Sequence, residues 1–568
     1  MIKQDTTETS NISVRSKKTN SLLISCQAAL KTAQQLENQA HEHAVKTVMH
    51  EGHFDNSMAV ANQFSLHGYA WLATYIEALH QLLKWAERLE TVGILGELEE
   101  LILRSGFGEY LGQISGGITM SQVETVRLSD LGINEEAEHA FRTAEVTRLI
   151  RDGNNPQTRQ AIANLIVDGH FGALGLEDVD LQLIRNQFQK FSNERIAPFA
   201  QSWHKADSLI PDEVIAEMAE LGVFGLTVPQ KWGGSESGKT AMCLVTEELC
   251  RGYLGVGSLA TRTEIAADLI REHGTESQKQ RWLSGLAKGE VLPTAMFTEP
   301  DVGSDLASVS TRASHSGDVY KINGSKTWST HAARADLITM LVRTDPDQPG
   351  HRGISMLLAP KPRGTDAEPF PAPGMRGTEI KVLGYRGMKE YEIGFDDFEV
   401  PDDCLLGKIE GQGFKQLMSG METARIQTAA RSIGVAQNAL ELGLNYASER
   451  QQFGRSIYDF PRISGKLAFM TVEIMMARQL TWAAAREKDG GRRCDLEAGM
   501  AKLLAARVAW SSADNAMQIH GGNGYAEEYP ISRVLLDSRI LNVFEGTGEI
   551  QAQIIARRLL QSNRSPTH

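Results

Sequence analysis

The sequence predicts an α+β fold that is mainly helical, with one antiparallel β domain in the middle of the chain. Two features of the sequence carry this prediction. Apolar residues recur at three- and four-residue steps, as in helices, near both ends of the chain, whereas short β-rich runs lie between about 291 and 406. At 568 residues the chain is too long for one hydrophobic core, so we expect several domains.

Changes in this pattern divide the chain into five parts. Residues 1–20 are polar and aperiodic, which predicts a disordered tail. Residues 21–173 should form a helical N-terminal extension, followed by a second helical domain over 174–290. We expect the β domain over 291–406 and a C-terminal helical domain over 407–568.

The extension carries the clearest helical periodicity. One face of a helix should be buried there, because six side chains recur at three- or four-residue steps: Trp71, Tyr75, Leu79, Leu82, Ala86 and Leu89. The glycines near 106–108 and 116–117 are expected to form turns. No chemistry is evident in this part of the chain.

Composition excludes several classes of function. A net charge of -13 argues against nucleic acid as a partner, which needs a basic face. No apolar run approaches the roughly 20 residues needed to span a bilayer, and no signal peptide is recognised, so we expect a cytoplasmic protein. The five cysteines form no CxxC pair, and no metal site is predicted.

The strongest candidate for a catalytic residue is Glu545. It directly precedes Gly546 and Thr547, where an apolar run joins a helix. A carboxylate packed behind Val543 and Phe544 would be desolvated, which is expected to raise its pKa and suits a general base. These residues alone leave open the alternative of a solvated glutamate at a helix N-cap.

Four motifs that precede Glu545 resemble those of the acyl-CoA dehydrogenase family. They are the segments 298–305 (TEPDVGSD), 323–330 (NGSKTWST), 449–454 (ERQQFG) and 518–525 (QIHGGNGY). The resemblance covers about residues 180–562 and ends with Glu545-Gly546-Thr547. It implies a helical N-terminal domain, a middle β domain and a C-terminal helical bundle, to which this chain adds its helical extension.

The resemblance also implies FAD-dependent α,β-dehydrogenation of an acyl-CoA. Glu545 would take the α-proton and flavin N5 the β-hydride, while the Glu545 backbone N–H and a ribityl hydroxyl would hold the enolate oxygen. Family members pass their electrons to electron-transferring flavoprotein. The implied cofactor contacts are Phe297, Thr298, Ser304, Trp328, Ser329, Thr330, Arg450, Gln452, Phe453, Gln518, Gly521, Gly522, Thr547 and Glu549.

Part of this set implies a homo-oligomer. Arg450, Gln452 and Phe453, with Gln518 and the glycines at 521–522, would meet the FAD of a neighbouring subunit. We favour a dimer, because the extension could cover a face that tetrameric relatives use for assembly.

The extension and the segment 383–392 narrow the range of substrates that the resemblance implies. They resemble those of family members that oxidise (2S)-methylsuccinyl-CoA to mesaconyl-CoA in the ethylmalonyl-CoA pathway. Because this substrate has a free carboxylate, its pocket needs a cation, for which Arg262 is our hypothesis. Lys389 and Tyr391 are weaker candidates for this cation site. The alternative for Arg262 is that it lies on the surface, paired with Glu264. Other implied substrate contacts are Ser304, Glu422, Arg425 and Gly546.

Three other functions stay open at this point. They are dehydrogenation of another short or branched acyl-CoA, an acyl-CoA oxidase that passes electrons to oxygen, and a helical scaffold without activity. In a minority of the family the base lies on an earlier helix. That position is Ala424 here, which cannot take a proton, so Glu545 is favoured as the base.

Overall fold

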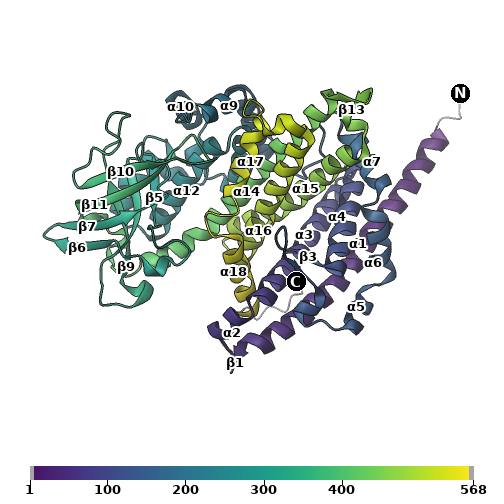
Figure 1. Ribbon diagram of the computed structural model, residues 1–568, viewed down its shortest axis with the longest axis horizontal. Helices are drawn as coiled ribbons and strands as arrows, with labels where there is room; N and C mark the ends of the chain where they lie inside the picture. Colours follow the sequence, from purple (N-terminus) through teal and green to yellow (C-terminus); the bar gives the residue numbers. More distant parts are fainter. Residues whose placement is uncertain (1–4, 562–568) are drawn as a thin grey trace.

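The computed structural model describes residues 5–561, with side chains from residue 19 onward. The β sheet lies at one end of the elongated molecule and the helical extension at the other, with the remaining helices between them (Figure 1). This arrangement confirms the predicted mainly helical α+β fold.

The extension is built from seven helices and two small hairpins. The hairpins are β1 (Met49–His50) with β2 (His53–Phe54), and β3 (Ile118–Thr119) with β4 (Thr125–Val126). The helices are α1 (Asp5–Val48), α2 (Asn56–Ala61), α3 (Gln63–Thr91), α4 (Glu97–Gly116), α5 (Glu135–Phe141), α6 (Ala144–Gly153) and α7 (Pro156–Ile166).

Two predictions for the extension are corrected here. A disordered tail was expected over 1–20, but helix α1 begins at Asp5. A helix that has nucleated extends at little cost in free energy per residue, so polar residues can continue it. Residues 1–4 lie outside the described part of the chain. The glycines near 106 lie inside α4 and not in a turn. A Cβ on Gly106 would lie 2.7 Å from Leu82 and 3.0 Å from Met476, so glycine lets α4 approach α3 and the C-terminal bundle closely.

The second helical region and the sheet follow. The helices are α8 (Val179–Phe191), α9 (Ala197–Lys205), α10 (Asp212–Glu220), α11 (Gly238–Gly252), α12 (Leu254–His273) and α13 (Glu276–Ala287). The strands are β5 (Pro293–Met296), β6 (Arg312–Ser316), β7 (Val319–Lys326), β8 (Leu337–Arg343), β9 (Ile354–Pro360), β10 (Met375–Ile380) and β11 (Glu390–Pro401).

The sheet is mixed and not purely antiparallel. Its order is β10-β11-β7-β6-β8-β5, with β9 also paired to β8. Strand β5 runs parallel to β8, which is possible because the long connection between them leaves room for a crossover. In β11, Tyr391, Ile393 and Phe395 face the core of the β domain, whereas Glu390 faces the opposite side.

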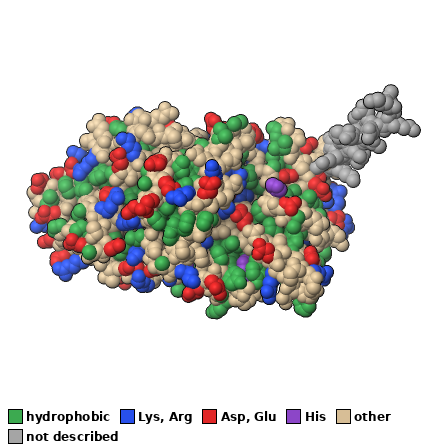
Figure 2. All heavy atoms as spheres, turned by 90° about the horizontal axis from the view of Figure 1, so that it is seen from above, with side chains coloured by type: hydrophobic (Ala, Val, Ile, Leu, Met, Phe, Trp, Pro, Cys, Tyr) green, Lys and Arg blue, Asp and Glu red, His purple; other side chains and the backbone are tan. Residues whose placement is uncertain are grey.

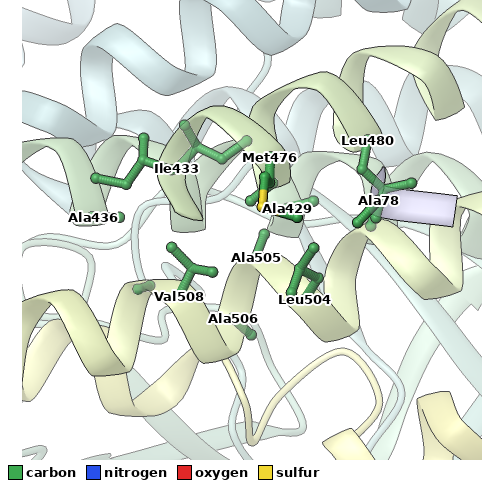
Figure 3. Packing of buried hydrophobic residues seen from close by; sticks show 14 of the residues in the cluster. Ala78, Ala429, Ile433, Ala436, Met476, Leu480, Leu504, Ala505, Ala506 and Val508 are labelled. Atoms are coloured by element: carbon green, nitrogen blue, oxygen red, sulfur yellow. The ribbon is translucent and has the colours of Figure 1, made fainter. Parts of the chain in front are cut away.

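The C-terminal region forms a helical bundle around the central helix α14. Small and apolar side chains of α14, α15 and α16 meet in its core, joined there by Ala78 of α3 (Figure 3). Its elements are α14 (Gly413–Glu449), the hairpin of β12 (Gln451–Gln452) and β13 (Arg455–Ser456), α15 (Pro461–Asp489), α16 (Asp495–His520), α17 (Pro530–Ile540) and α18 (Gly548–Gln561).

A partly buried arginine joins the extension to this bundle. Arg507 of α16 donates to the Tyr110 hydroxyl at 2.8 Å and to Glu473 at 2.9 Å, and it also donates to the Tyr75 hydroxyl. The Tyr75 and Tyr110 rings stack with centroids 4.2 Å apart. Since both tyrosines belong to the extension, this polar cluster fixes its position against α15 and α16.

We expect Tyr75→Phe to loosen this attachment. The substitution removes the hydroxyl that accepts from Arg507 and donates to Gln113 at 2.7 Å, so it should lower the free energy of unfolding by about 1–2 kcal/mol. Urea unfolding followed by tryptophan fluorescence measures the change. Tyr525→Phe is the matched control, because Tyr525 is 87% exposed and should unfold like the wild type. Equal midpoints for all three proteins would contradict a stabilising role for the cluster.

On the face seen in Figure 2, positively and negatively charged side chains are interspersed with apolar areas. No helix within residues 5–561 is long and apolar enough to cross a membrane. Among those same residues no group of three or more His, Cys, Asp or Glu side chains could hold a metal ion.

Candidate active site

Glu545 lies in the turn between α17 and α18, on a strained backbone. Its φ of 52° is a left-handed value that is uncommon for a residue other than glycine, and Gly546 follows at 86°. Side chains hold this turn in place. Lys502 donates to the Gly546 carbonyl at 2.6 Å, and Gln551 donates to the Glu545 carbonyl at 3.2 Å. The turn therefore aims the Glu545 side chain into the protein rather than into solvent.

The Glu545 carboxylate is held by residues from two other helices. Arg431 of α14 donates to Oε2 at 2.5 Å, and Thr428 donates to the same oxygen. An Arg262 Nη atom of α12 lies 3.7 Å from Oε1. Within the described chain, Oε1 is buried and accepts no hydrogen bond. One oxygen of Glu545 is thus anchored, and the other is left available to receive a proton.

These arginines reverse one expectation from the sequence. Burial raises the pKa of Glu545, as predicted, but the charges of Arg431 and Arg262 outweigh burial and hold that pKa below its usual value. The prediction of a raised pKa is therefore wrong for this structure. Glu545 is ionised at neutral pH, which is the state that a general base requires.

Arg262 is buried beside Glu545. Its Nη2 donates to the Tyr385 hydroxyl at 3.2 Å and to Thr330 Oγ1 at 3.4 Å, and its Nε has no partner among the described residues. The alternative of a surface arginine paired with Glu264 does not hold, because Glu264 is buried against Lys239 at 2.7 Å. Arg262 therefore has donors left for an anionic ligand.

Glu390 is a charged neighbour that the sequence analysis missed. It accepts from Thr330 at 3.0 Å, and burial raises its pKa to about 7 although the charge of Arg262 opposes this. Tyr385, also missed, is fixed by its backbone N–H to Asp537 at 2.7 Å and by its ring against Phe544. A possible signal for Glu390 was its place at the start of an alternating strand, where a buried carboxylate needs a partner.

Lys389 and Tyr391 have contacts elsewhere. The Lys389 ammonium pairs with Glu379 at 3.2 Å. The Tyr391 side chain packs edge-on against Phe370 in the core of the β domain. The structure therefore does not bring these two side chains together with Glu545.

The other predicted substrate residues lie on α14 and in two loops. Glu422 pairs with Lys488 at 2.8 Å, and Arg425 is buried with an Nε that has no partner among the described residues. Gly546 follows the base directly. Ser304 is exposed in the loop after β5.

The residues predicted to meet the flavin ring fit a flat aromatic group. Trp328 has a φ of 54° and leaves 55% of its surface exposed, and the buried Ser329 hydroxyl has no partner in the described chain. Their loop runs beside Thr298, whose carbonyl accepts from the Thr327 N–H at 3.0 Å, and beside Phe297. Because Thr330 contacts Arg262, this surface adjoins the site around Glu545.

The remaining predicted cofactor residues form two groups. Thr547 accepts from the Ile550 N–H at 3.3 Å and, next to Glu549, caps α18. The other group is exposed near the β12–β13 hairpin, far along the molecule from the sheet (Figure 1). A contact between Asn523 and Tyr446 at 3.0 Å joins its two segments, which contain Arg450, Gln452, Phe453, Gln518, Gly521 and Gly522.

Comparison with known protein families shows to which family the chain belongs. Models of the acyl-CoA dehydrogenase N-terminal, middle and C-terminal domains match residues 178–290, 294–398 and 411–560. The chain belongs to the acyl-CoA dehydrogenase family. This family is FAD-dependent, so the chain is a flavoprotein oxidoreductase that acts on an acyl-CoA.

Individual acyl-CoA dehydrogenases resemble the chain to different extents. The (2S)-methylsuccinyl-CoA dehydrogenase of Cereibacter sphaeroides is 58% identical over 95% of this chain and 98% of its own. A solved complex of glutaryl-CoA dehydrogenase with glutaryl-CoA is 32% identical, with a TM-score of 0.64, over 68% of this chain and 98% of its own. A glutaryl-CoA dehydrogenase of Mycobacterium smegmatis with FADH2 is 28% identical, with a TM-score of 0.62, over 68% and 96%. Only the first of these three spans the extension.

Proposed function

We propose that this acyl-CoA dehydrogenase oxidises (2S)-methylsuccinyl-CoA to mesaconyl-CoA. The observation that carries the proposal is the buried Arg262 guanidinium, which lies 3.7 Å from the Glu545 carboxylate with its Nε unpartnered within the described chain. A buried cation beside the base suits a substrate with its own carboxylate, and would be costly to leave unpaired beside an apolar acyl chain. The 58% identity to a (2S)-methylsuccinyl-CoA dehydrogenase supports the same substrate.

Glu545 is the base in this proposal. Its Oε1 would take the α-proton while Arg431 and Thr428 keep Oε2 in place. The Glu545 backbone N–H makes no hydrogen bond within the described chain, so it is free to donate to the thioester oxygen as negative charge develops there. One residue thereby supplies both the base and a donor for the enolate.

The cofactor supplies the second half of the reaction. FAD, when bound, accepts the hydrogen and electron pair that leave the β-carbon. Phe297, Thr298, Trp328, Ser329 and Thr330 are the residues that would hold its flavin ring. These residues adjoin the site around Arg262 and Glu545, since Thr330 contacts Arg262 directly.

Arg262 links substrate binding to the strength of the base. In the free enzyme its charge helps to lower the pKa of Glu545. A substrate carboxylate that pairs with Arg262 offsets this charge, so the pKa of Glu545 should rise only when such a substrate is bound. Acyl-CoA chains without a carboxylate leave the base weaker.

Assembly and electron transfer complete the proposal. Phe453 is 92% exposed and Tyr525 87%, which supports a contact of this region with a neighbouring subunit. We infer a homo-oligomer, with a dimer favoured because the extension covers α15 and α16. Electron-transferring flavoprotein is the proposed acceptor, in the cytoplasm.

Anaerobic bleaching of the flavin near 450 nm tests the substrate. The purified protein is mixed separately with methylsuccinyl-, glutaryl-, butyryl- and isobutyryl-CoA, and rapid bleaching is expected with methylsuccinyl-CoA alone. Glutaryl-CoA is the informative comparison, because it also offers Arg262 a carboxylate but lacks the α-methyl group. Faster bleaching by butyryl- or isobutyryl-CoA would overturn the proposed substrate, and peroxide formation in air would favour an oxidase.

A further inference from the structure

A second pocket lies between the extension and the C-terminal helices. Its volume is about 400 Å³, and none of its lining residues belongs to the site around Glu545. Helices α1 and α3 form one wall, and α15, α16 and α18 form the other. Since α1 and α3 lie in the extension, this pocket exists only because the chain carries that extension.

The pocket contains a buried carboxyl group without a partner. Glu37 of α1 is only 7% exposed, and within the described residues its side chain makes no hydrogen bond or ion pair. Buried carboxylates in proteins are almost always paired. The nearest charge acting on Glu37 is another carboxylate, Glu77 of α3, which cannot stabilise it. Glu37 therefore faces the pocket, and its carboxyl oxygens have no hydrogen-bond donor among the described residues.

The charges that line the pocket are mostly negative. Arg492 is the single arginine among the described lining residues. It is bound to Glu487 through two N–H groups, one at 2.9 Å, so little of its charge is left for the pocket. His41 lies 3.0 Å from the Tyr69 hydroxyl. The four acidic residues in the lining are Glu37, Glu77, Glu487 and Glu497.

The lining also contains the polar side chains of Gln34, His80 and Gln81, beside an apolar surface. Ile76 of α3, Leu480 of α15, and Leu496 and Met500 of α16 provide this surface. Acidic groups beside an apolar wall suit a ligand that carries a positive charge on a hydrocarbon body. A bare metal ion fits poorly, because no three potential metal ligands come together among the described residues.

We propose that this pocket binds a small aliphatic amine, whose ammonium group pairs with the Glu37 carboxylate and whose chain lies along the apolar wall. Such a charge-assisted hydrogen bond would satisfy Glu37. The site is separate from the acyl-CoA site, and its two walls belong to different parts of the chain. The bound amine would therefore bridge the extension and the catalytic bundle.

Binding should depend on pH. Burial and, to a smaller extent, Glu77 raise the pKa of Glu37 to about 8, so at pH 7 the carboxyl group must release a proton to pair with an ammonium group. The pKa of His80 is raised by its hydrogen bond to Glu77, and the pKa of His41 is lowered by burial. Because an aliphatic amine stays charged to about pH 10, its affinity should rise from pH 7 to pH 9.

Calorimetric titration of the full-length holoenzyme with 1,5-diaminopentane tests the proposal. We expect one saturable site per chain, and binding at least about tenfold weaker in Glu37→Gln, which keeps the shape of the side chain but removes its charge. Glu42→Gln is the matched control, because Glu42 is exposed on the same helix and its loss should change the affinity less than about threefold.

Two further measurements use the wild-type protein alone. At pH 7 the binding heat should differ between buffers of different ionisation enthalpy, since Glu37 releases its proton. The uncharged 1-pentanol should give no saturable binding. Equal affinity of the wild type and Glu37→Gln, equal binding of 1-pentanol, or no saturable heat with the diamine at millimolar concentration would each overturn the proposal.

Discussion

Glu545→Gln should lower the rate of flavin reduction by about 100- to 10,000-fold, the contribution typical of a positioned general base. The amide has nearly the shape of the carboxylate and can still accept from Arg431 and Thr428 through its oxygen. It cannot, however, take the α-proton. FAD content should be unchanged, because the residues proposed to hold the flavin lie on the sheet side of the site.

Stopped-flow reduction under anaerobic conditions measures this effect, with methylsuccinyl-CoA as substrate. Glu545→Asp is the graded comparison, since it keeps a carboxylate but withdraws it by one methylene group, and its rate should fall between those of the wild type and the Gln variant. A Gln variant with bound FAD and more than about a tenth of the wild-type rate would rule out Glu545 as the base.

Periodicity in the sequence was enough to predict most of the fold. The buried face of α3 follows directly from the spacing of Trp71, Leu79 and Leu82, all of which are buried. Gly106 was misread because glycine is treated as a breaker of helices, whereas here it serves close packing against Leu82 and Met476. Whether a glycine breaks a helix depends on its neighbours in space, which local sequence does not show.

The same limit explains the error in the pKa of Glu545. The sequence showed the apolar residues that bury the carboxylate, but not Arg431 and Thr428, which lie more than a hundred residues earlier in the chain. A signal was present, because Arg425, Thr428 and Arg431 recur at three-residue steps in α14. Arginine is rarely buried unless it is paired, so such a row predicts a polar site inside the bundle.

Positions in the β domain could be predicted less well. Glu390 and Tyr391 are adjacent, yet β alternation sends Glu390 toward Thr330 and Tyr391 into the core of the β domain. Tyr391 was a weaker candidate for the partner of the substrate carboxylate, whereas Glu390 was not considered. Which of two neighbours faces the site depends on the register of β11, and that register is set by β7 and β10.

Arg262→Gln should lower kcat/KM for methylsuccinyl-CoA by at least about 30-fold, the equivalent of about 2 kcal/mol. The guanidinium lies 3.7 Å from Oε1 of Glu545, the oxygen that accepts no hydrogen bond within the described chain. Without it the substrate carboxylate would enter a site that already holds the acidic side chains of Glu545 and Glu390. Activity with butyryl-CoA should be retained or improved, because that substrate has no carboxylate to pair.

The pH profile separates a direct role of Arg262 from a general loss of structure. Loss of its positive charge should raise the pKa of Glu545, so the acidic limb of kcat/KM should move to higher pH in Arg262→Gln. Lys389→Gln is the control, since its ammonium pairs with Glu379 and its loss should change kcat/KM less than about threefold. An unchanged acidic limb together with a change of less than about threefold in Arg262→Gln would remove Arg262 from the site. A large effect of Lys389→Gln would instead favour Lys389, directly before β11, as the partner of the substrate carboxylate.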